Sequence, residues 1–299
     1  MALDGCGQSV LFFQGWIRMN GLPMWCLLLM TSLGGCSWFT GPPQLPVASS
    51  VTLDELIVYS DFKLPENHRL LRDLELLRTD VTDQLAVPVS DEQVQIYVFK
   101  TPKRYRKFLR EHFPDFPDRR AFFVETDTRL NVYSYWGDRI AEDLRHEVCH
   151  GYLHAVIPEI PLWLDEGLAE YFECSPGDGG LNEMHLKQLL DAENDGEWQP
   201  DLAYLEQLEN IRDMHQIEYA EAWLWAHFFL RTTPARKQIL QDYLTQCRSH
   251  PARSFSKGLL KVEPDAEKNL IAHLKMLKET PSLFQDQTDV KILEADRSE

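Results

Sequence analysis

Basic residues are scarce in this sequence, where 30 Lys and Arg stand against 47 Asp and Glu, for a formal net charge of -17. An acidic surface repels phosphate backbones and anionic headgroups, so nucleic acid is not expected as a partner. Internal repeats are also absent. The chain does have an ordinary globular composition, with 44% hydrophobic residues, enough for a sizeable core in one domain with a helical extension.

The first 40 residues lack an apolar run that could span a bilayer, because the run at 22–33 is shorter than the roughly 20 residues that a membrane helix needs. That length is typical of a signal peptide. The run ends in LGGC at Cys36, which resembles the lipobox of bacterial lipoproteins, where the Cys receives lipid. We therefore predict a lipoprotein-type signal peptide at 1–35. The alternatives are a plain cleaved export signal and a true start at Met19.

On this interpretation the mature protein is exported, to the periplasm or the cell surface, and meets a bacterial membrane only through a lipid anchor on Cys36. A Pro-rich linker at 36–50, a folded domain at 51–280 and a polar, flexible tail at 281–299 follow from the composition along the chain. No oligomeric state is predicted.

The predicted folded part of the chain contains few cysteines, and their number is odd. Of six in the chain, three belong to the leader, which leaves Cys149, Cys174 and Cys247 for the folded part. An odd number argues against a disulfide framework. Cys174 can pair with Cys247 in an oxidising compartment, or all three can be buried thiols that pack as small apolar side chains.

Hydrophobic patterning predicts strands ahead of a mainly helical half. Alternation and β-forming residues indicate strands at 56–59, 94–99, 121–125 and 129–136. Apolar residues at helical spacing, together with Pro and Gly punctuation, indicate helices at 65–87, 102–110, 138–156 and from 162, with Gly137 and Asp138 stopping a strand and capping the third of these helices. Beyond residue 180 the pattern is helical almost throughout.

A basic segment at 100–110 stands out in an otherwise acidic protein. Six Lys and Arg side chains gather there, which suits contact with a polyanion or with lipid headgroups. The simpler interpretation is the solvated face of a helix.

The helix at 138–156 contains the pattern HExxH, formed by His146, Glu147 and His150. Residues four apart lie on one helical face, so both imidazoles can converge on one metal ion. Glu147 then sits beside the ion, where a carboxylate can take a proton from an attacking water molecule. Two solvent-facing histidines on an amphipathic helix are the alternative.

A second helix supplies the third ligand. After Pro158 and Pro161 the chain reads WLDEGLAEY, and a turn at the prolines brings Glu166 level with the two histidines within one helical turn. Asp165 is explained by the helix dipole. Glu170, one turn further on, is a candidate to accept the second N–H of a ligating histidine, with a surface carboxylate as the alternative.

The HExxH helix followed by WLDEGLAEY resembles the gluzincin zinc metallopeptidases, in particular the peptidase MA-like group, over roughly residues 53–230. The resemblance implies an α+β, zincin-like fold, with a small mixed β-sheet and an active-site helix followed by a mainly helical C-terminal part. It also implies Zn²⁺ held by His146, His150 and Glu166, with Glu147 as general base in peptide-bond hydrolysis. The linker between His150 and Glu166 is shorter than in thermolysin-like enzymes and the large aminopeptidases, which argues against those two subfamilies.

Peptide hydrolysis also requires a donor for the oxyanion of the tetrahedral intermediate, which in this clan is a Tyr or His. His215, Tyr219 and His227 are candidates, and Tyr219 is chosen because its segment resembles the helix where relatives keep such a Tyr. The strand at 129–136 is predicted to be the sheet edge that an extended peptide or protein substrate joins.

Two other functions compete with a zinc peptidase. A non-catalytic exported lipoprotein can use the same fold as a binding scaffold with structural zinc, although three ligands and a base argue against it. The second is an iron or other metal hydrolase that acts on a non-peptide bond, because two histidines and a carboxylate also form the facial triad of oxygenases, although the spacing on the HExxH helix favours zinc.

Overall fold

The computed structural model describes residues 44–175, 177–249 and 254–279. The signal peptide at 1–35, the lipidation site Cys36 and the tail at 281–299 lie outside these residues, so the anchor and the exported location stay predictions. Within the described part, no helix combines the length and the apolar character needed to cross a membrane.

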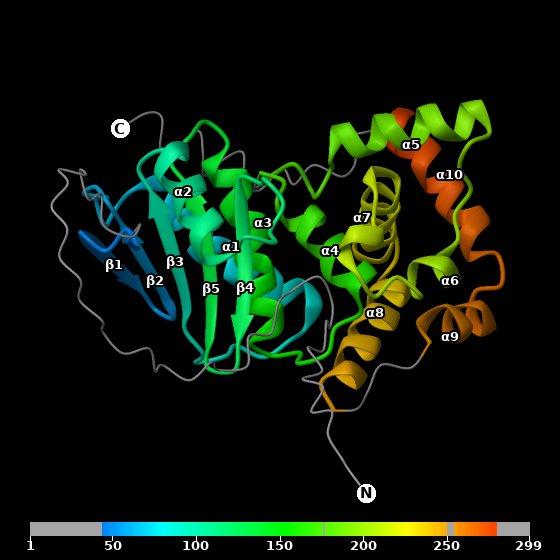
Figure 1. Cartoon of the computed structure of the whole chain (residues 1–299). Coiled ribbons are helices and arrows are strands. Elements are labelled where there is room, and N and C mark those ends of the chain that lie inside the picture. Colours follow the sequence, from blue (N-terminus) through cyan, green and yellow to red (C-terminus); the bar gives the residue numbers. More distant parts are fainter. Residues whose placement is uncertain (1–43, 176, 250–253, 280–299) are drawn as a thin grey trace, which may run out of the picture.

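A mixed five-stranded sheet forms one side of the molecule (Figure 1), with the strand order β1-β2-β3-β5-β4. The central strands β2, β3 and β5 are parallel, and the outer strands β1 and β4 pair antiparallel with their neighbours. This sheet and the helical remainder confirm the predicted α+β class with a small mixed sheet. The strands are β1 (Ser49–Leu53), β2 (Leu56–Ser60), β3 (Val94–Phe99), β4 (Ala121–Thr126) and β5 (Arg129–Tyr135).

Both faces of the sheet are covered, because side chains alternate along each strand. On β3, Val94, Ile96 and Val98 face the main core with helices α1 (Arg69–Leu85) and α3 (Ile140–His154). Tyr97 and Phe99 face the opposite way, into a smaller aromatic cluster with helix α2 (Pro102–His112). Helix α3, which carries the HExxH pattern, is therefore held between the sheet and the helical half.

Helices make up the remainder of the described chain. Helix α4 packs against both α3 and α7, and lies between the sheet and the C-terminal helices in Figure 1. Because nearly all side chains of α4 are buried, its polar residues must find partners inside the protein. These helices are α4 (Leu162–Phe172), α5 (Glu183–Asp195), α6 (Leu202–Leu205), the 3₁₀ turn η1 (Ile211–Asp213), α7 (Gln216–Arg231), α8 (Pro234–Cys247), α9 (Phe255–Val262) and α10 (Ala266–Glu279).

The starts of three elements differ from the sequence-based predictions. Strand β1 was not predicted, and it begins at Ser49 inside the expected linker. Helix α1 begins at Arg69 rather than Pro65, because the His68 side chain accepts the N–H of Leu70 and caps the helix there. Helix α3 begins at Ile140 with no side-chain cap, so Asp138 does not cap it.

The predicted peptide-binding edge is also wrong. Strand β5, which covers most of the segment at 129–136, pairs with β3 on one side and with β4 on the other, so its backbone groups are already used. The edge strand that packs against α3 is β4.

Cys149, Cys174 and Cys247 are free thiols. This agrees with the interpretation of three unpaired cysteines rather than a Cys174–Cys247 disulfide. Cys149 and Cys247 are buried and belong to the main core, where they pack as small apolar residues.

Helix α2 buries its apolar side chains Tyr105, Phe108 and Leu109 in the aromatic cluster and turns its basic residues outward. Two of these form ion pairs across the surface, Arg104 with Asp61 and Arg106 with Asp118. The arrangement is that of a solvated helix face.

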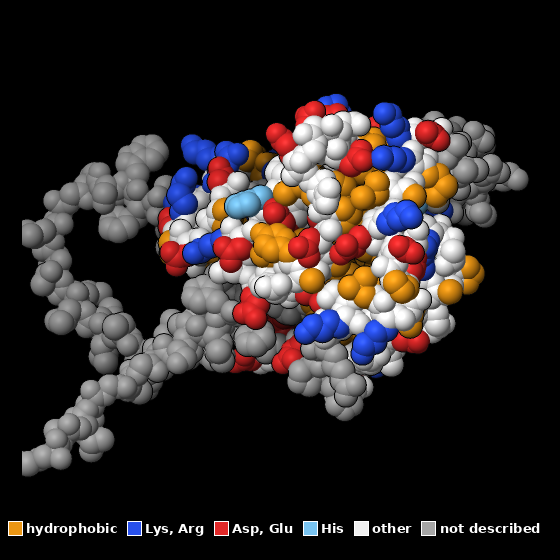
Figure 2. All heavy atoms as spheres, turned by 90° about the vertical axis from the view of Figure 1, so that its right-hand side faces the viewer, with side chains coloured by type: hydrophobic (Ala, Val, Ile, Leu, Met, Phe, Trp, Pro, Cys, Tyr) orange, Lys and Arg blue, Asp and Glu red, His pale blue; other side chains and the backbone are white. Residues whose placement is uncertain are grey.

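The face of the molecule formed by the C-terminal helices mixes acidic, basic and apolar side chains without a field of one sign (Figure 2). The exposed large apolar residues of α5, α6, α9 and α10 are spread along the chain at Met184, Tyr204, Leu260, Val262 and Met276. Scattered apolar residues of this kind are normal on protein surfaces.

We expect the free energy of unfolding to fall as the pH is lowered from about 6.5 to about 4, because of a buried histidine pair. His227 Nδ1 on α7 lies 3.0 Å from His273 Nε2 on α10, and both rings are almost fully buried. Burial, with a smaller contribution from Arg236, lowers the pKa of His273 to about 4, and burial also lowers the pKa of His227. The unfolded chain therefore binds more protons than the folded one in this pH range.

For His273 alone the loss is on the order of 3 kcal/mol, at 1.36 kcal/mol per pKa unit. Urea unfolding at a series of pH values measures it, and His273→Gln is expected to flatten the dependence. Parallel pH dependences for the wild type and His273→Gln between pH 6.5 and 4 would contradict the prediction.

Candidate metal centre

Two helices in contact, α3 and α4, place the site residues. His146, Glu147 and His150 lie on α3, and Glu166 is the fifth residue of α4. Between the helices the chain turns through residues 155–161, and Pro161 occupies the N-cap position of α4. The structure therefore brings together the four residues that the two motifs predict.

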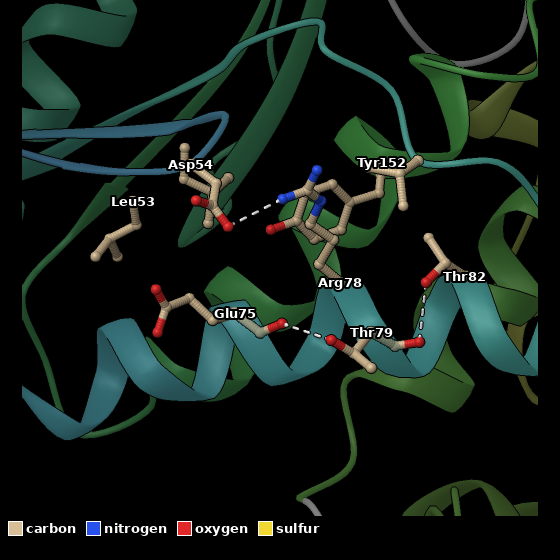
Figure 3. A pocket seen from close by; sticks show the side chains of 9 residues that line it. Leu53, Asp54, Glu75, Arg78, Thr79, Thr82 and Tyr152 are labelled. Carbon is tan, nitrogen blue, oxygen red and sulfur yellow. Dashed lines mark hydrogen bonds and ion pairs between the residues drawn. The ribbon is translucent and has the colours of Figure 1, made fainter.

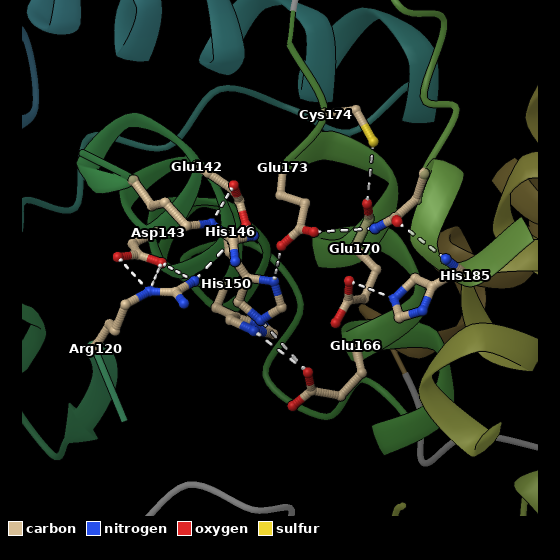
Figure 4. Close-up of polar contacts among 12 residues, drawn as sticks. Arg120, Glu142, Asp143, His146, His150, Glu166, Glu170, Glu173, Cys174 and His185 are labelled. Carbon is tan, nitrogen blue, oxygen red and sulfur yellow. Dashed lines mark hydrogen bonds and ion pairs between the residues drawn. The ribbon is translucent and has the colours of Figure 1, made fainter. Parts of the chain in front are cut away.

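The ligand atoms of His146, His150 and Glu166 lie within 4.8 Å of one another. Glu166 Oε2 is 3.5 Å from His146 Nε2 and 3.9 Å from His150 Nε2, and Figure 4 shows both rings turned toward this carboxylate. A tetrahedral zinc ion with bonds of about 2.0–2.1 Å separates its ligand atoms by about 3.3 Å. The two distances from Glu166 to the imidazole nitrogens are close to that separation.

The Glu166 carboxylate is the strongest sign that a cation belongs here. The residue is 1% exposed, and neither carboxylate oxygen has a hydrogen-bond partner among the described residues. Glu221, a similarly buried carboxylate of the same chain, accepts hydrogen bonds from Trp198 Nε1, Trp225 Nε1 and the Asp201 backbone N–H. A buried carboxylate without donors is costly unless a cation compensates it.

The electrostatic field at this point also favours positive charge. Burial alone lowers the pKa of His146, but the carboxylates of Glu166 and Glu173 outweigh burial and raise the pKa well above its ordinary value. The same negative field stabilises a divalent cation between the ligand atoms.

Glu147 is buried beside the ligands, and its Oε2 atom has no hydrogen-bond partner in the described part of the chain. Burial raises the pKa of the carboxyl, and the charge of Glu166 adds to the shift. A carboxylate with a raised pKa is a better proton acceptor near neutral pH than an exposed one.

Glu170 pairs with a histidine other than the predicted ligands. Its Oε2 atom accepts from His185 Nε2 at 2.8 Å. Glu173, one turn further along, takes the predicted position instead, because its Oε2 lies 3.1 Å from His146 Nδ1 while its Oε1 accepts from Asn182. The His146 Nδ1–H therefore points at Glu173, and its Nε2 lone pair faces Glu166 (Figure 4).

Asp165 does more than complement a helix dipole. It is 1% exposed, and its Oδ1 lies 2.9 Å from His150 Nδ1. The second predicted histidine ligand is therefore oriented by a carboxylate in the same way as the first, with its Nε2 toward Glu166.

Tyr219 lies in the first turn of α7, and its hydroxyl accepts a hydrogen bond from Arg119 Nη2 at 3.3 Å. Burial and then the charge of Glu166 raise its pKa, so the phenol keeps its proton. Of the two other candidates, His227 is buried against His273, and His215 is the N-cap residue of α7.

Glu173 and Arg119 were not predicted from the sequence, and His154 was given no role. His154 carried a signal, since it lies four residues after His150 on the same helical face. Glu173 lies seven residues, or two turns, after Glu166. Nothing local in the sequence indicates Arg119.

A pocket of about 300 Å³ lies apart from these residues, between α1 and the β1–β2 turn (Figure 3). Arg78 projects into it and pairs with Asp54 at 3.3 Å and with Glu55. These ion pairs fasten the β1–β2 hairpin to α1.

No family model matches the sequence, and no curated protein matches it. Among solved structures, the fold is similar to an M1 zinc metallopeptidase from Deinococcus radiodurans, with a TM-score of 0.36 and 18% identity over 77% of this chain and 51% of that one. A mutant of a two-domain M1 zinc metallopeptidase bound to L-tryptophan gives a TM-score of 0.36 and 18% identity, over 78% of this chain and 52% of that one. The chain thus spans about half the length of these structures. A likeness at this level does not establish a family.

Proposed function

We propose that the protein is a zinc-dependent peptidase in which His146, His150 and Glu166 hold the ion and Glu147 is the general base. The observation that carries the proposal is the buried Glu166 carboxylate, which has no hydrogen-bond donor in the described structure and faces two imidazole nitrogens at 3.5 and 3.9 Å. A catalytic base directly beside these ligands favours a hydrolase over a purely structural site.

The donor set suits zinc. Two imidazoles and one carboxylate are typical ligands of catalytic Zn²⁺, and three protein ligands leave a coordination position open. When bound, zinc lowers the pKa of a water molecule toward about 7 and polarises the carbonyl that is attacked.

The chain's own residues move the protons. Glu147 removes one from the attacking water and later gives it to the departing amine, which is why a carboxyl with a raised pKa is useful here. Tyr219 keeps its phenolic proton and is proposed as the donor to the oxyanion. Arg119 donates to the phenol oxygen, so the hydroxyl hydrogen is directed elsewhere.

A peptide or protein is the proposed substrate. Strand β4 ends the strand order and packs against α3, so an extended peptide can pair with it close to the HExxH helix. This replaces β5 as the proposed pairing strand.

The test is digestion of a peptide library by the purified protein, with and without a zinc chelator, after metal analysis of protein prepared in chelator-free buffer. We expect about one zinc per chain, cleavage that stops with the chelator and cleavage that returns with added zinc. Full zinc occupancy without cleavage would instead favour the non-catalytic scaffold, and iron in place of zinc would favour the facial-triad alternative.

The partners of the histidine ligands give a further prediction. Glu173→Gln is expected to weaken zinc binding by about 10–100-fold, because an amide is a weaker acceptor than a carboxylate for His146 Nδ1–H. Glu170→Gln is the matched variant on the same stretch of chain, and its zinc affinity is expected to stay closer to wild type, because Glu170 pairs with His185. Competition with a chromophoric chelator measures both constants. Equal losses would contradict the assignment of Glu173.

A further inference from the structure

A buried row of hydrogen bonds runs from His150 away from the proposed ion. His150 Nδ1 lies 2.9 Å from Asp165 Oδ1, and Asp165 Oδ2 lies 3.0 Å from His154 Nε2. His154 Nδ1 in turn lies 2.8 Å from Glu125 Oε2. The row joins α3, α4 and the edge strand β4. The side chains of His150, Asp165 and His154 are at most 2% exposed, and that of Glu125 is 16% exposed.

The acceptors fix where the protons lie. Each Asp165 oxygen faces one imidazole nitrogen, so His150 Nδ1 and His154 Nε2 both carry hydrogen. The other nitrogen of His154 faces the Glu125 carboxylate, so His154 donates from both ring nitrogens and is an imidazolium. Burial alone disfavours that charge, but Asp165 and Glu125 outweigh burial and raise the pKa of His154 to about 9.

The His154 ring gives the buried Asp165 carboxylate a second donor. Without that donor the carboxylate would lose a hydrogen bond that fixes its orientation toward His150. Phe123 on β4 packs against both rings, with centroids 6.1 Å from His150 and 5.2 Å from His154, and limits their rotation.

We propose that His154 and Glu125 are positioning residues, which hold His150 through Asp165 with its Nε2 lone pair directed at the metal position. The inference rests on the proposed function. It adds two residues that do not contact the ion and act on the ligand His150 through Asp165. His154 does not touch the substrate or the ion. The alternative is that a second metal ion binds between His150, His154 and Asp165. The ligand atoms of these three residues also lie within 4.8 Å of one another.

The experiment compares the zinc affinity of the full chain with those of His154→Gln, Glu125→Gln, Asp165→Asn and the double variant His154→Gln/Asp165→Asn, by chelator competition. We expect His154→Gln to weaken binding by about 10–100-fold and Glu125→Gln to weaken it less. Because His154 acts only through Asp165, the double variant is expected to bind zinc no more weakly than Asp165→Asn alone. A purely structural role for His154 gives additive losses instead.

The matched control is His273→Gln, which removes an equally buried histidine whose partner is His227. Its zinc affinity is expected to match wild type, and melting temperatures of the metal-free proteins separate general destabilisation from loss of the site. If His154→Gln does not fold, Glu125→Gln carries the test, because that side chain is at the sheet edge and partly exposed.

A His154→Gln affinity equal to wild type overturns this inference, as do two zinc ions per wild-type chain. If the wild-type protein binds zinc but cleaves no peptide, the proposed function is overturned. The zinc affinities of the variants then still test the role of His154. A wild-type protein that binds no zinc overturns both.

Discussion

Glu147→Gln is expected to lower kcat/KM for peptide cleavage by roughly 10²–10⁴-fold while zinc affinity stays at its wild-type value. Glutamine preserves the shape of the side chain but cannot accept a proton from water or return it to the amine. Glu147 is not one of the three predicted ligands, and its Oε2 atom makes no hydrogen bond within the described structure, so its replacement leaves the ligand atoms in place. Steady-state kinetics and chelator competition measure the two quantities.

Glu142→Gln is the control for that experiment, because it makes the same chemical change in the first turn of the same helix. Glu142 forms ion pairs with Arg139 and Arg120 near the surface and is not one of the predicted ligands. Wild-type activity is expected. If Glu147→Gln kept full activity, Glu147 would lose its role, and a loss of zinc in that variant would show that it acts as a ligand.

Much of the fold could be predicted because burial imposes periodicity on the sequence. The alternation of Val94, Ile96 and Val98 marks β3, and helical spacing in α1 follows the side chains that it buries. Strand β1 was missed because only one of its residues at 49–53 is buried and most of them are polar. The interior place of β5 depends on which strands pair, and pairing between distant segments leaves no local signal.

The site residues also divide into those that local spacing predicts and those that depend on tertiary packing. Two histidines four apart on one helix converge whatever the rest of the fold does, so His146 and His150 could be predicted from spacing alone. The choice between Glu170 and Glu173 could not, because it depends on the angle at which α4 crosses α3 and on where α4 ends. One turn of helix separates the two carboxylates, and only the packed structure decides which of them reaches His146 Nδ1.

The row from His150 to Glu125 was missed for a related reason. Asp165 has a sufficient local explanation at the start of α4, and Glu125 lies in a strand remote in sequence. Their common partner His154 becomes informative only when α3, α4 and β4 are placed side by side. Buried polar residues of this kind require partners, so burial is the property that turns such positions into candidates.

Gly167→Ala is expected to destabilise the protein by about 3 kcal/mol or more, at the upper end of the cost of overpacking. A Cβ atom at Gly167 would lie 2.4 Å from the Ala222 carbonyl oxygen and 2.7 Å from its carbon. Both are backbone atoms of α7, so α4 and α7 must move apart rather than a side chain turning aside. Glu166 is the neighbouring residue, and its carboxylate moves with α4.

The shift therefore also weakens zinc binding in whatever fraction of Gly167→Ala folds, because the third ligand is displaced from His146 and His150. Gly258→Ala is the matched control, since a Cβ at that helical position meets nothing within 4 Å. It is expected to stabilise the protein by about 0.5–1 kcal/mol and to leave zinc affinity unchanged. Urea unfolding of the metal-free proteins measures the change in stability. The added stability in the presence of zinc measures the change in zinc binding. A Gly167→Ala variant with wild-type stability would mean that α4 and α7 pack less closely than the structure places them.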